Sequence, residues 1–142
     1  MNRESIYSAL YSRLQTVAGF TTVSRRLKHW ADVSAAETPY IGMIQRREDP
    51  DGSRAFMPLR WTLHVDFYLY AHTTDPRGSP AIILNPLLDA VLTAFSGDVP
   101  TNTVTLGGQV YHCRVSGSIE TDEGVLGDLA VAIIPLMIIV PD

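Results

Sequence analysis

The strongest constraint on the fold is an apolar run in the last part of the sequence. From Leu129 to Val140 there are twelve residues without a charged or hydrogen-bonding side chain, and Pro135 lies among them. A helix that spans a bilayer needs about 20 apolar residues, so this run predicts no membrane anchor. Read with a period of two residues, both of its faces are apolar, and such a strand must be covered on both sides.

The same run leads to a prediction about the sheet. Because Pro135 has no N–H to donate to a ladder, we expect this strand near an edge of the sheet or at a bulge. One of its faces is expected in the core. The other face needs a second layer or a neighbouring subunit, so we interpret the run as a clue to assembly.

The segment RWTLHVDFYLYAHT carries the clearest strand pattern, because apolar residues alternate along it with mixed ones. The apolar face consists of Trp61, Leu63, Val65, Phe67, Leu69 and Ala71. The mixed face consists of Thr62, His64, Asp66, Tyr68, Tyr70 and His72. The first face predicts the core, whereas the second suits a surface that is wet in the monomer and covered in an assembly.

Two segments are predicted to be helices. ESIYSALYSRLQTV has apolar residues every three or four positions, with Asn2 or Ser5 as its cap. AIILNPLLDAVLTAFSG ends at Gly97; either its regular part begins at Pro86 after an Asn85 cap, or the helix kinks there. The apolar positions of the first helix are Ile6, Leu10, Leu14 and Val17.

The remaining segments complete an α+β pattern. FTTVSRRL and YIGMIQRRED are predicted strands, and Gly107 with Gly108 predicts the turn of a hairpin, NTVTLGGQVYHCRVSG. SIETDEG is acidic and is expected to be a loop. We therefore predict a single domain over residues 1–142, with a mainly antiparallel sheet and two α-helices packed on one face.

Charge and cysteine content narrow the function. The net charge is −4, which disfavours a dedicated nucleic-acid binder. Residues 1–60 hold nine Arg and Lys against six Asp and Glu, or +3, and residues 61–142 hold two against nine, or −7. These halves either meet between copies or are unrelated solvated faces. Cys113 is the only cysteine, which favours a reducing compartment, and we interpret it as a small buried hydrophobe.

Motifs for catalysis or metal binding are scarce. The sequence has no glycine-rich phosphate loop, and no pair of Cys or His residues has zinc spacing. His64 and Asp66 lie two residues apart on one strand, where a carboxylate orienting an imidazole makes a general base. Nothing marks a nucleophile or an oxyanion hole, so a small enzyme using these two residues is the lesser alternative.

Two charged segments are candidate interface regions. One is a basic cluster of Arg25, Arg26 and Lys28, which suits contact with phosphates, contact with an acidic partner, or exposure to solvent. The other is QRREDPDGSRAFMP, which is longer and more charged than a simple hairpin connection needs, so it is either a mobile surface loop or an arm that orders on a neighbour. Their candidate interface residues are Arg25, Arg26, Lys28, Arg46, Arg47, Glu48, Asp49, Asp51, Arg54, Phe56 and Met57.

Taken together, the chain resembles the tail terminator (tail completion) proteins of long-tailed bacteriophages and prophages. The resemblance rests on the order of elements and on ESIYSALYSRLQTV, WTLHVDFYLYAHT, NPLLDAVLTAF and LGDLAVAIIPLMIIVPD, with VTLGGQVYHCRVSGSIETDEG between the last two. These are patterns rather than catalytic motifs. Pro86 departs from the regular helix that the resemblance leads us to expect.

The resemblance implies a homo-hexameric ring that caps the growing tail tube, stops its polymerisation and offers a surface to the head–tail connector. It implies no enzymatic activity and no cofactor, with DNA only as cargo passing through the ring. The expected location is the virion tail or neck, after assembly in the bacterial host cytoplasm. Another neck component, a head–tail connector or adaptor protein, is the closest alternative.

Overall fold

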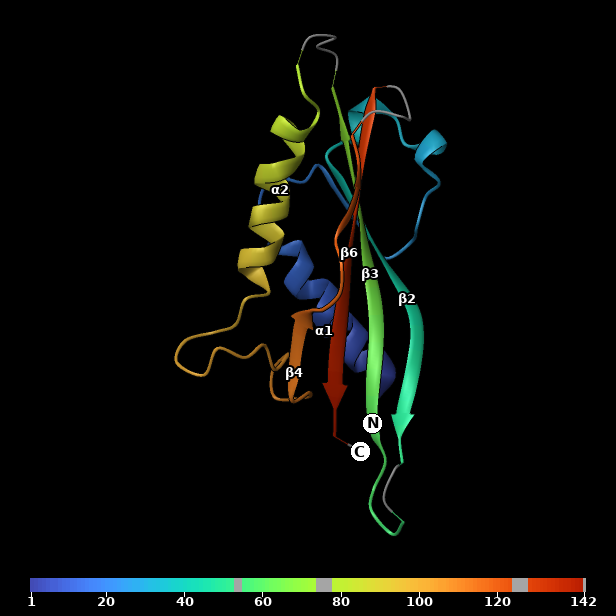
Figure 1. Cartoon of the computed structure of the whole chain (residues 1–142), viewed down its shortest axis with the longest axis vertical. Coiled ribbons are helices and arrows are strands. Elements are labelled where there is room, and N and C mark those ends of the chain that lie inside the picture. Colours follow the sequence, from blue (N-terminus) through green and yellow to red (C-terminus); the bar gives the residue numbers. More distant parts are fainter. Residues whose placement is uncertain (53–54, 74–77, 124–127, 142) are drawn as a thin grey trace.

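A computed structural model of the chain describes residues 1–52, 55–73, 78–123 and 128–141. Within them, two α-helices accompany a mainly antiparallel sheet of six strands, so the predicted α+β class is confirmed (Figure 1). The elements in chain order are α1 (Arg3–Gln15), β1 (Thr22–Ser24), the short 3-10 helices η1 (Trp30–Asp32) and η2 (Ala35–Glu37), β2 (Tyr40–Asp51), β3 (Arg60–His72), α2 (Ala81–Ala94), β4 (His112–Val115), β5 (Glu120–Asp122) and β6 (Leu129–Val140).

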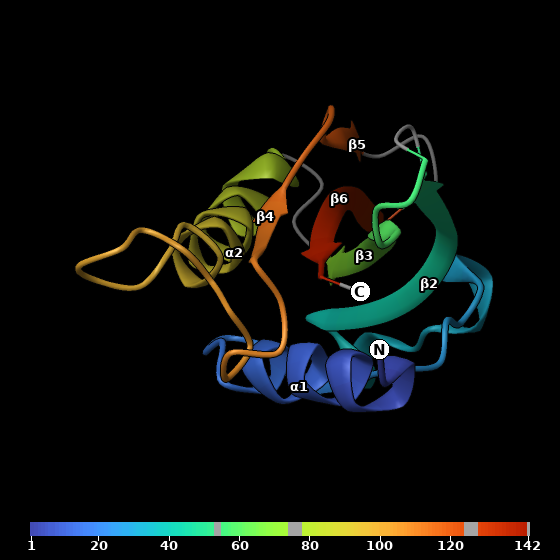
Figure 2. The same cartoon turned by 90° about the horizontal axis from the view of Figure 1, so that it is seen from below.

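The strands form the order β1-β2-β3-β6-β4, and β5 also pairs with β6. All pairs are antiparallel except β1 with β2. The two helices pack on one face of this sheet (Figure 2). The apolar side chains there form two buried clusters, a larger one with α1 and the end of α2 and a smaller one with Leu84 and Leu87 of α2. Phe67 of β3 is buried in the larger cluster, with its ring centroid 5.4 Å from that of Phe95 after α2. This face is the predicted core face of β3.

The apolar run forms β6, which lies next to the edge strand β4 rather than at the edge itself, in line with the predicted position near an edge. It pairs with β3 over its whole length, and β4 and β5 share its other side. Pro135 fits there because β4 pairs from Leu136 onward and β5 only up to Ile133, so the proline falls between the two partner strands. The carbonyl of Pro135 accepts from the Ser116 backbone N–H at 2.9 Å on that side. The missing N–H therefore costs no ladder bond.

The alternation predicted for this run is confirmed. The face of β6 toward the helices is buried, with Ala132, Ile134, Leu136 and Ile138 at 0–1% exposure. The opposite face is only half-buried, from Val131 to Ile139. Neither helix in the described part of the chain is long and apolar enough to cross a membrane.

Three local predictions need correction. The strand β2 continues through Asp51, so much of the expected charged loop is paired with β3, up to Asp51 opposite Arg60. The segment SIETDEG contains β5, because its residues find free ladder positions on β6. The predicted hairpin has its turn, with Gly107 and Gly108 at positive φ, but its first arm is no strand and β4 pairs with β6 instead.

The helix ends agree with the sequence better at α1 than at α2. Asn2 caps α1 by accepting the Ser5 backbone N–H at 3.1 Å, as predicted. The second helix already begins at Ala81, so Pro86 lies inside it and the expected start at Pro86 is wrong. In place of Asn85, Glu123 supplies a capping carboxylate, since its Oε1 accepts from the Ala81 N–H at 3.3 Å.

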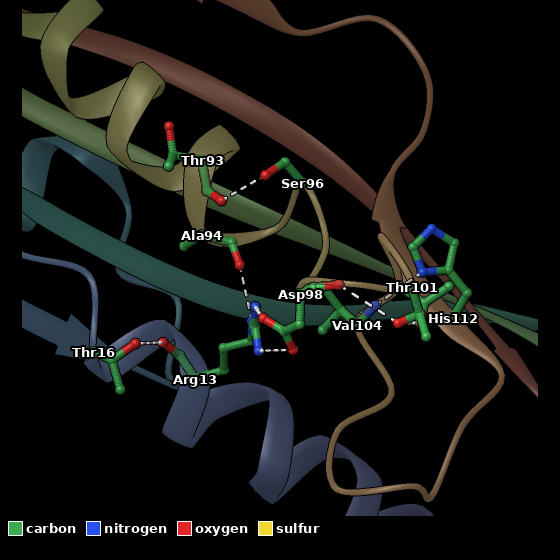
Figure 3. A network of polar contacts seen from close by, with 10 residues as sticks. Arg13, Thr16, Thr93, Ala94, Ser96, Asp98, Thr101, Val104 and His112 are labelled. Atoms are coloured by element: carbon green, nitrogen blue, oxygen red, sulfur yellow. Dashed lines mark hydrogen bonds and ion pairs between the residues drawn. The ribbon is translucent and has the colours of Figure 1, made fainter.

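Arg13 joins the two helices. Its Nε donates to the Ala94 carbonyl at 2.9 Å at the end of α2, and its two terminal nitrogens contact the Asp98 carboxylate at 3.3 and 2.9 Å (Figure 3). The guanidinium also lies 5.7 Å from the Phe95 ring centroid. These bonds hold the pKa of Asp98 below its usual range, because they stabilise its charged form.

We predict that Asp98→Asn destabilises the fold near neutral pH and that the deficit disappears in acid. A carboxyl whose pKa is lowered by folding stabilises the native state above its unfolded pKa, and this contribution is lost as pH falls through the folded value. The urea midpoints of parent and variant should therefore differ near pH 7, approach each other as the pH falls below about 4, and converge below the lowered folded pKa of Asp98. Asp89→Asn, at an exposed position of α2, is the control, and equal midpoints for Asp98→Asn and parent at neutral pH would contradict the prediction.

Candidate functional site

The sheet face opposite the helices is the largest candidate site; we call it the outer face. Where β2 begins and β3 ends, the segment between β1 and β2 covers this face. There the Tyr40 hydroxyl donates to the Arg26 carbonyl at 2.6 Å, and the Tyr70 hydroxyl to the Lys28 carbonyl at 2.9 Å. Burial, more than its tyrosine neighbours, raises the pKa of Tyr70 to about 12. This end of the outer face is closed by the chain itself.

The rest of the outer face is only half-buried. It has an apolar stripe on β6 beside a polar stripe on β3. The apolar stripe consists of Val131, Ile133, Pro135, Met137 and Ile139. The polar stripe consists of Thr62, His64, Asp66 and Tyr68. In the described chain neither α-helix lies over these stripes, so the mixed face predicted from the β3 pattern is partly accessible, although Asp66 and Tyr70 on it are buried.

The connection between β2 and β3 forms the second candidate surface. The two strands extend beyond the helices as an arm whose tip lies at one end of the molecule (Figure 1). Phe56 is fully exposed at 106% and Met57 is 58% exposed, as predicted, and Leu59 adds a third exposed apolar side chain. Phe56 also has a φ of 66°, a left-handed conformation that costs a residue with a Cβ about 1–2 kcal/mol.

The predicted charged residues of this arm are mostly paired within the chain. Arg47 contacts the Asp49 carboxylate at 3.2 Å. Glu48 lies on the helix side, where it accepts from Arg3 at 2.7 Å and from the Tyr7 hydroxyl at 3.1 Å. Asp51 is the last residue of β2, and it also takes part in a polar or electrostatic interaction.

Two predicted residues of the arm remain, Arg46 and Arg54, and the structure describes only the first of them. Arg46 lies at a β-bulge between Gln45 and Arg47 and reaches Asp66 at 3.4 Å. Arg54 lies outside the described residues. Except for Arg54, the predicted loop residues are therefore strand or hairpin residues of the β2–β3 arm.

The basic cluster also turns out to be largely neutralised. Arg25 contacts Glu4 of α1 at 2.6 Å, and this bond lowers the pKa of that carboxyl. Lys28 contacts Glu37 at 3.0 Å. Arg26 has no acidic partner among the described residues and lines a cavity of about 540 Å³ beside β1. Of the three cations in the predicted cluster, only the Arg26 guanidinium is therefore left without an acidic partner among the described residues.

The structure does not join His64 to Asp66. The His64 imidazole lies 2.8 Å from Asp49 on β2, whereas Asp66 contacts Arg46. The ring of His112 faces the preceding loop, because its Nδ1 accepts the Val104 backbone N–H at 3.2 Å. His64 and Asp66 do not pair because neighbours across the β2–β3 ladder are nearer to each side chain than the residue two positions along the strand.

No group of three or more potential metal ligands occurs among the described His, Cys, Asp and Glu residues. The sequence analysis gave the second face of the apolar run and the mixed face of β3 as possible assembly surfaces, but its candidate interface residues included neither the apolar stripe nor Tyr68. No protein-family model matches the chain, and no curated protein is similar enough to it to count as a relative.

We predict that Cys113 is unreactive in the folded protein. Its side chain is completely buried on the core face of β4, and this burial raises the pKa of the thiol to about 12. Little thiolate is then present at pH 8, so labelling by a thiol reagent should be slow in buffer and fast in urea. Rapid stoichiometric labelling without denaturant would show that β4 detaches readily from β6.

Proposed function

We propose that this protein is a structural assembly protein, a tail terminator of a long-tailed phage or prophage. Copies form a ring that caps the tail tube, stops its polymerisation and offers a surface for head–tail joining. The partners are other copies of the chain, the tail tube protein and the head–tail connector. In this proposal the protein acts in the tail or neck of the virion and catalyses no reaction.

The observation that carries the proposal is the half-buried apolar stripe on β6. A monomer gains free energy when a partner covers apolar surface that its own chain leaves only half-buried. This stripe lies between polar groups of β3 and β5 rather than in a deep apolar cavity. A broad mixed surface of this kind suits a protein partner better than a small substrate.

The β2–β3 arm supports the same proposal. A fully exposed phenylalanine in a left-handed conformation costs free energy in the isolated chain, and nothing in the described residues packs on it. Residues held in strained backbone conformations cluster at functional sites. The arm tip then contributes an aromatic anchor to a contact with another chain, which is the role in which aromatic residues are most effective.

The catalytic alternative has less support. The side chains that it needs, His64 and Asp66, have different partners, and Cys113 is buried in the core. A general base requires that its orienting carboxylate contact the imidazole. Asp49 does contact His64, but it also contacts Arg47 on an exposed strand, with no adjacent nucleophile among the described residues.

We predict that Phe56→Gly leaves the monomer folded but weakens assembly. Glycine removes the left-handed strain, which offsets its larger entropy in the unfolded chain, so stability should stay within about 1 kcal/mol of the parent. Loss of the aromatic anchor should weaken self-association or tube capping about tenfold or more. Light scattering across concentration, with and without tail tubes, and tube length after polymerisation measure these effects.

Ile82→Ser is the matched control, because Ile82 is also an exposed apolar residue (70%) but belongs to the first turn of α2. It should assemble like the parent. A parent protein that stays monomeric even beside tail tubes would overturn the proposed ring. A ring that binds the connector but leaves tube length unchanged would instead indicate the adaptor function.

A further inference from the structure

A cavity in the middle of the outer face has an unusual electrostatic composition. It has a volume of about 340 Å³ and lies where β2, β3, β5 and β6 come together. Its walls carry two carboxylates, Asp66 and Glu120, against a single guanidinium, that of Arg46. Tyr68 and Ser118 add polar walls, and Ile133 with Pro135 supplies an apolar side. We call this cavity the acidic socket.

Asp66 is the key group of the acidic socket. Its side chain is only 8% exposed, although no described helix covers this face. A buried carboxylate normally accepts several hydrogen bonds, since it has two oxygens with about four lone-pair positions. Among the described residues its one partner is Arg46, at 3.4 Å, which is long for a charged pair. No buried oxygen of Asp66 lacks a partner in the described chain, so a further donor would strengthen the long Arg46 contact rather than satisfy an orphaned atom.

The backbone of β2 is shaped around the same point. The register of β2 on β3 shifts between Gln45 and Arg47, so Arg46 is the extra residue of a bulge. Bulges redirect a side chain relative to the regular strand. Here the redirected guanidinium lies at one wall of the cavity, while Glu120 of β5 lines it as an exposed carboxylate. The net charge of −1 in this cavity favours a second cation.

We propose that the acidic socket receives an Arg or Lys side chain from a second copy of this chain. This inference rests on the proposed ring and names one contact within it. Two carboxylates with hydroxyl groups suit a guanidinium or ammonium head, and the apolar wall suits the methylene stem of such a side chain. A metal ion fits less well, since Ca²⁺ takes six to eight oxygen ligands.

Charge complementarity points to a second copy as the donor. Except for Arg46, the named walls come from residues 61–142, the half of the chain with net charge −7. Residues 1–60 carry net +3, including the Arg26 guanidinium, which has no acidic partner in the described chain. Contacts between the positively charged half of one copy and the negatively charged half of its neighbour would pair the excess charges of both.

The experiment compares self-association of the parent with three socket variants. Glu120→Gln removes an exposed charge without disturbing the core, Glu120→Arg fills the socket from its own chain, and Asp66→Asn tests the buried group. Each should raise the dissociation constant of the oligomer about tenfold or more, measured by analytical ultracentrifugation. Asp89→Asn, an exposed carboxylate on α2, is the control and should behave like the parent.

L-arginine amide is the competitor that tests the chemistry of the donor. At millimolar concentration it should weaken the parent oligomer and leave the Glu120→Arg variant unaffected, with glycine amide as the control. If the parent assembles and folded Glu120→Gln and Glu120→Arg assemble equally well, the socket inference is wrong and the ring stands. If these variants form rings but lose only tube binding, the donor is not a second copy, which also overturns the inference. A parent protein that does not assemble would contradict the proposed function itself.

Discussion

The structure depends on the ladder between β3 and β6. Twelve residue pairs run from His72 opposite Leu129 to Trp61 opposite Val140, and no other strand pair in the described chain is longer. Because side chains alternate across a strand, this ladder separates the apolar residues of both strands into two sets. One set forms the core with the helices, and the other becomes the outer face. Core and candidate interface thus arise from the same pairing.

This arrangement explains why an apolar run is compatible with a small domain. The two helices bury one side of β6, around Ile134 and Leu136, whereas the segment between β1 and β2 covers only one end of the other side, around Leu129. The side chains of Ile133 and Met137 remain half-buried beside polar groups of the neighbouring strands. Burial of apolar area contributes roughly 25 cal/mol per Å², so covering this stripe with another chain is favourable without any change of fold.

The sequence predicted what is local and periodic. The alternation in β3 and β6, the Asn2 cap and the glycine turn at 107–108 all depend on neighbours within a few residues, and all are confirmed. The sequence could not order the strands, because the place of Pro135 depends on the gap between β4 and β5. Nor could it show that the bulge directs Arg46 to Asp66, twenty residues away. Side-chain partners across strands require the register, which no single segment contains.

The edges of the sheet restrict how copies can associate. Beyond Gly42, the side of β2 away from β3 has no strand partner in the described chain, and such an edge invites strand addition. This stretch nevertheless carries a bulge at Arg46, a proline at position 50 and several charged side chains, features that disfavour pairing with another strand. On the opposite side of the sheet, the Cys113 backbone N–H of β4 is already satisfied by the Val104 carbonyl at 2.9 Å. Association through side chains of the outer face and the arm tip is therefore favoured over extension of the sheet from one copy to the next.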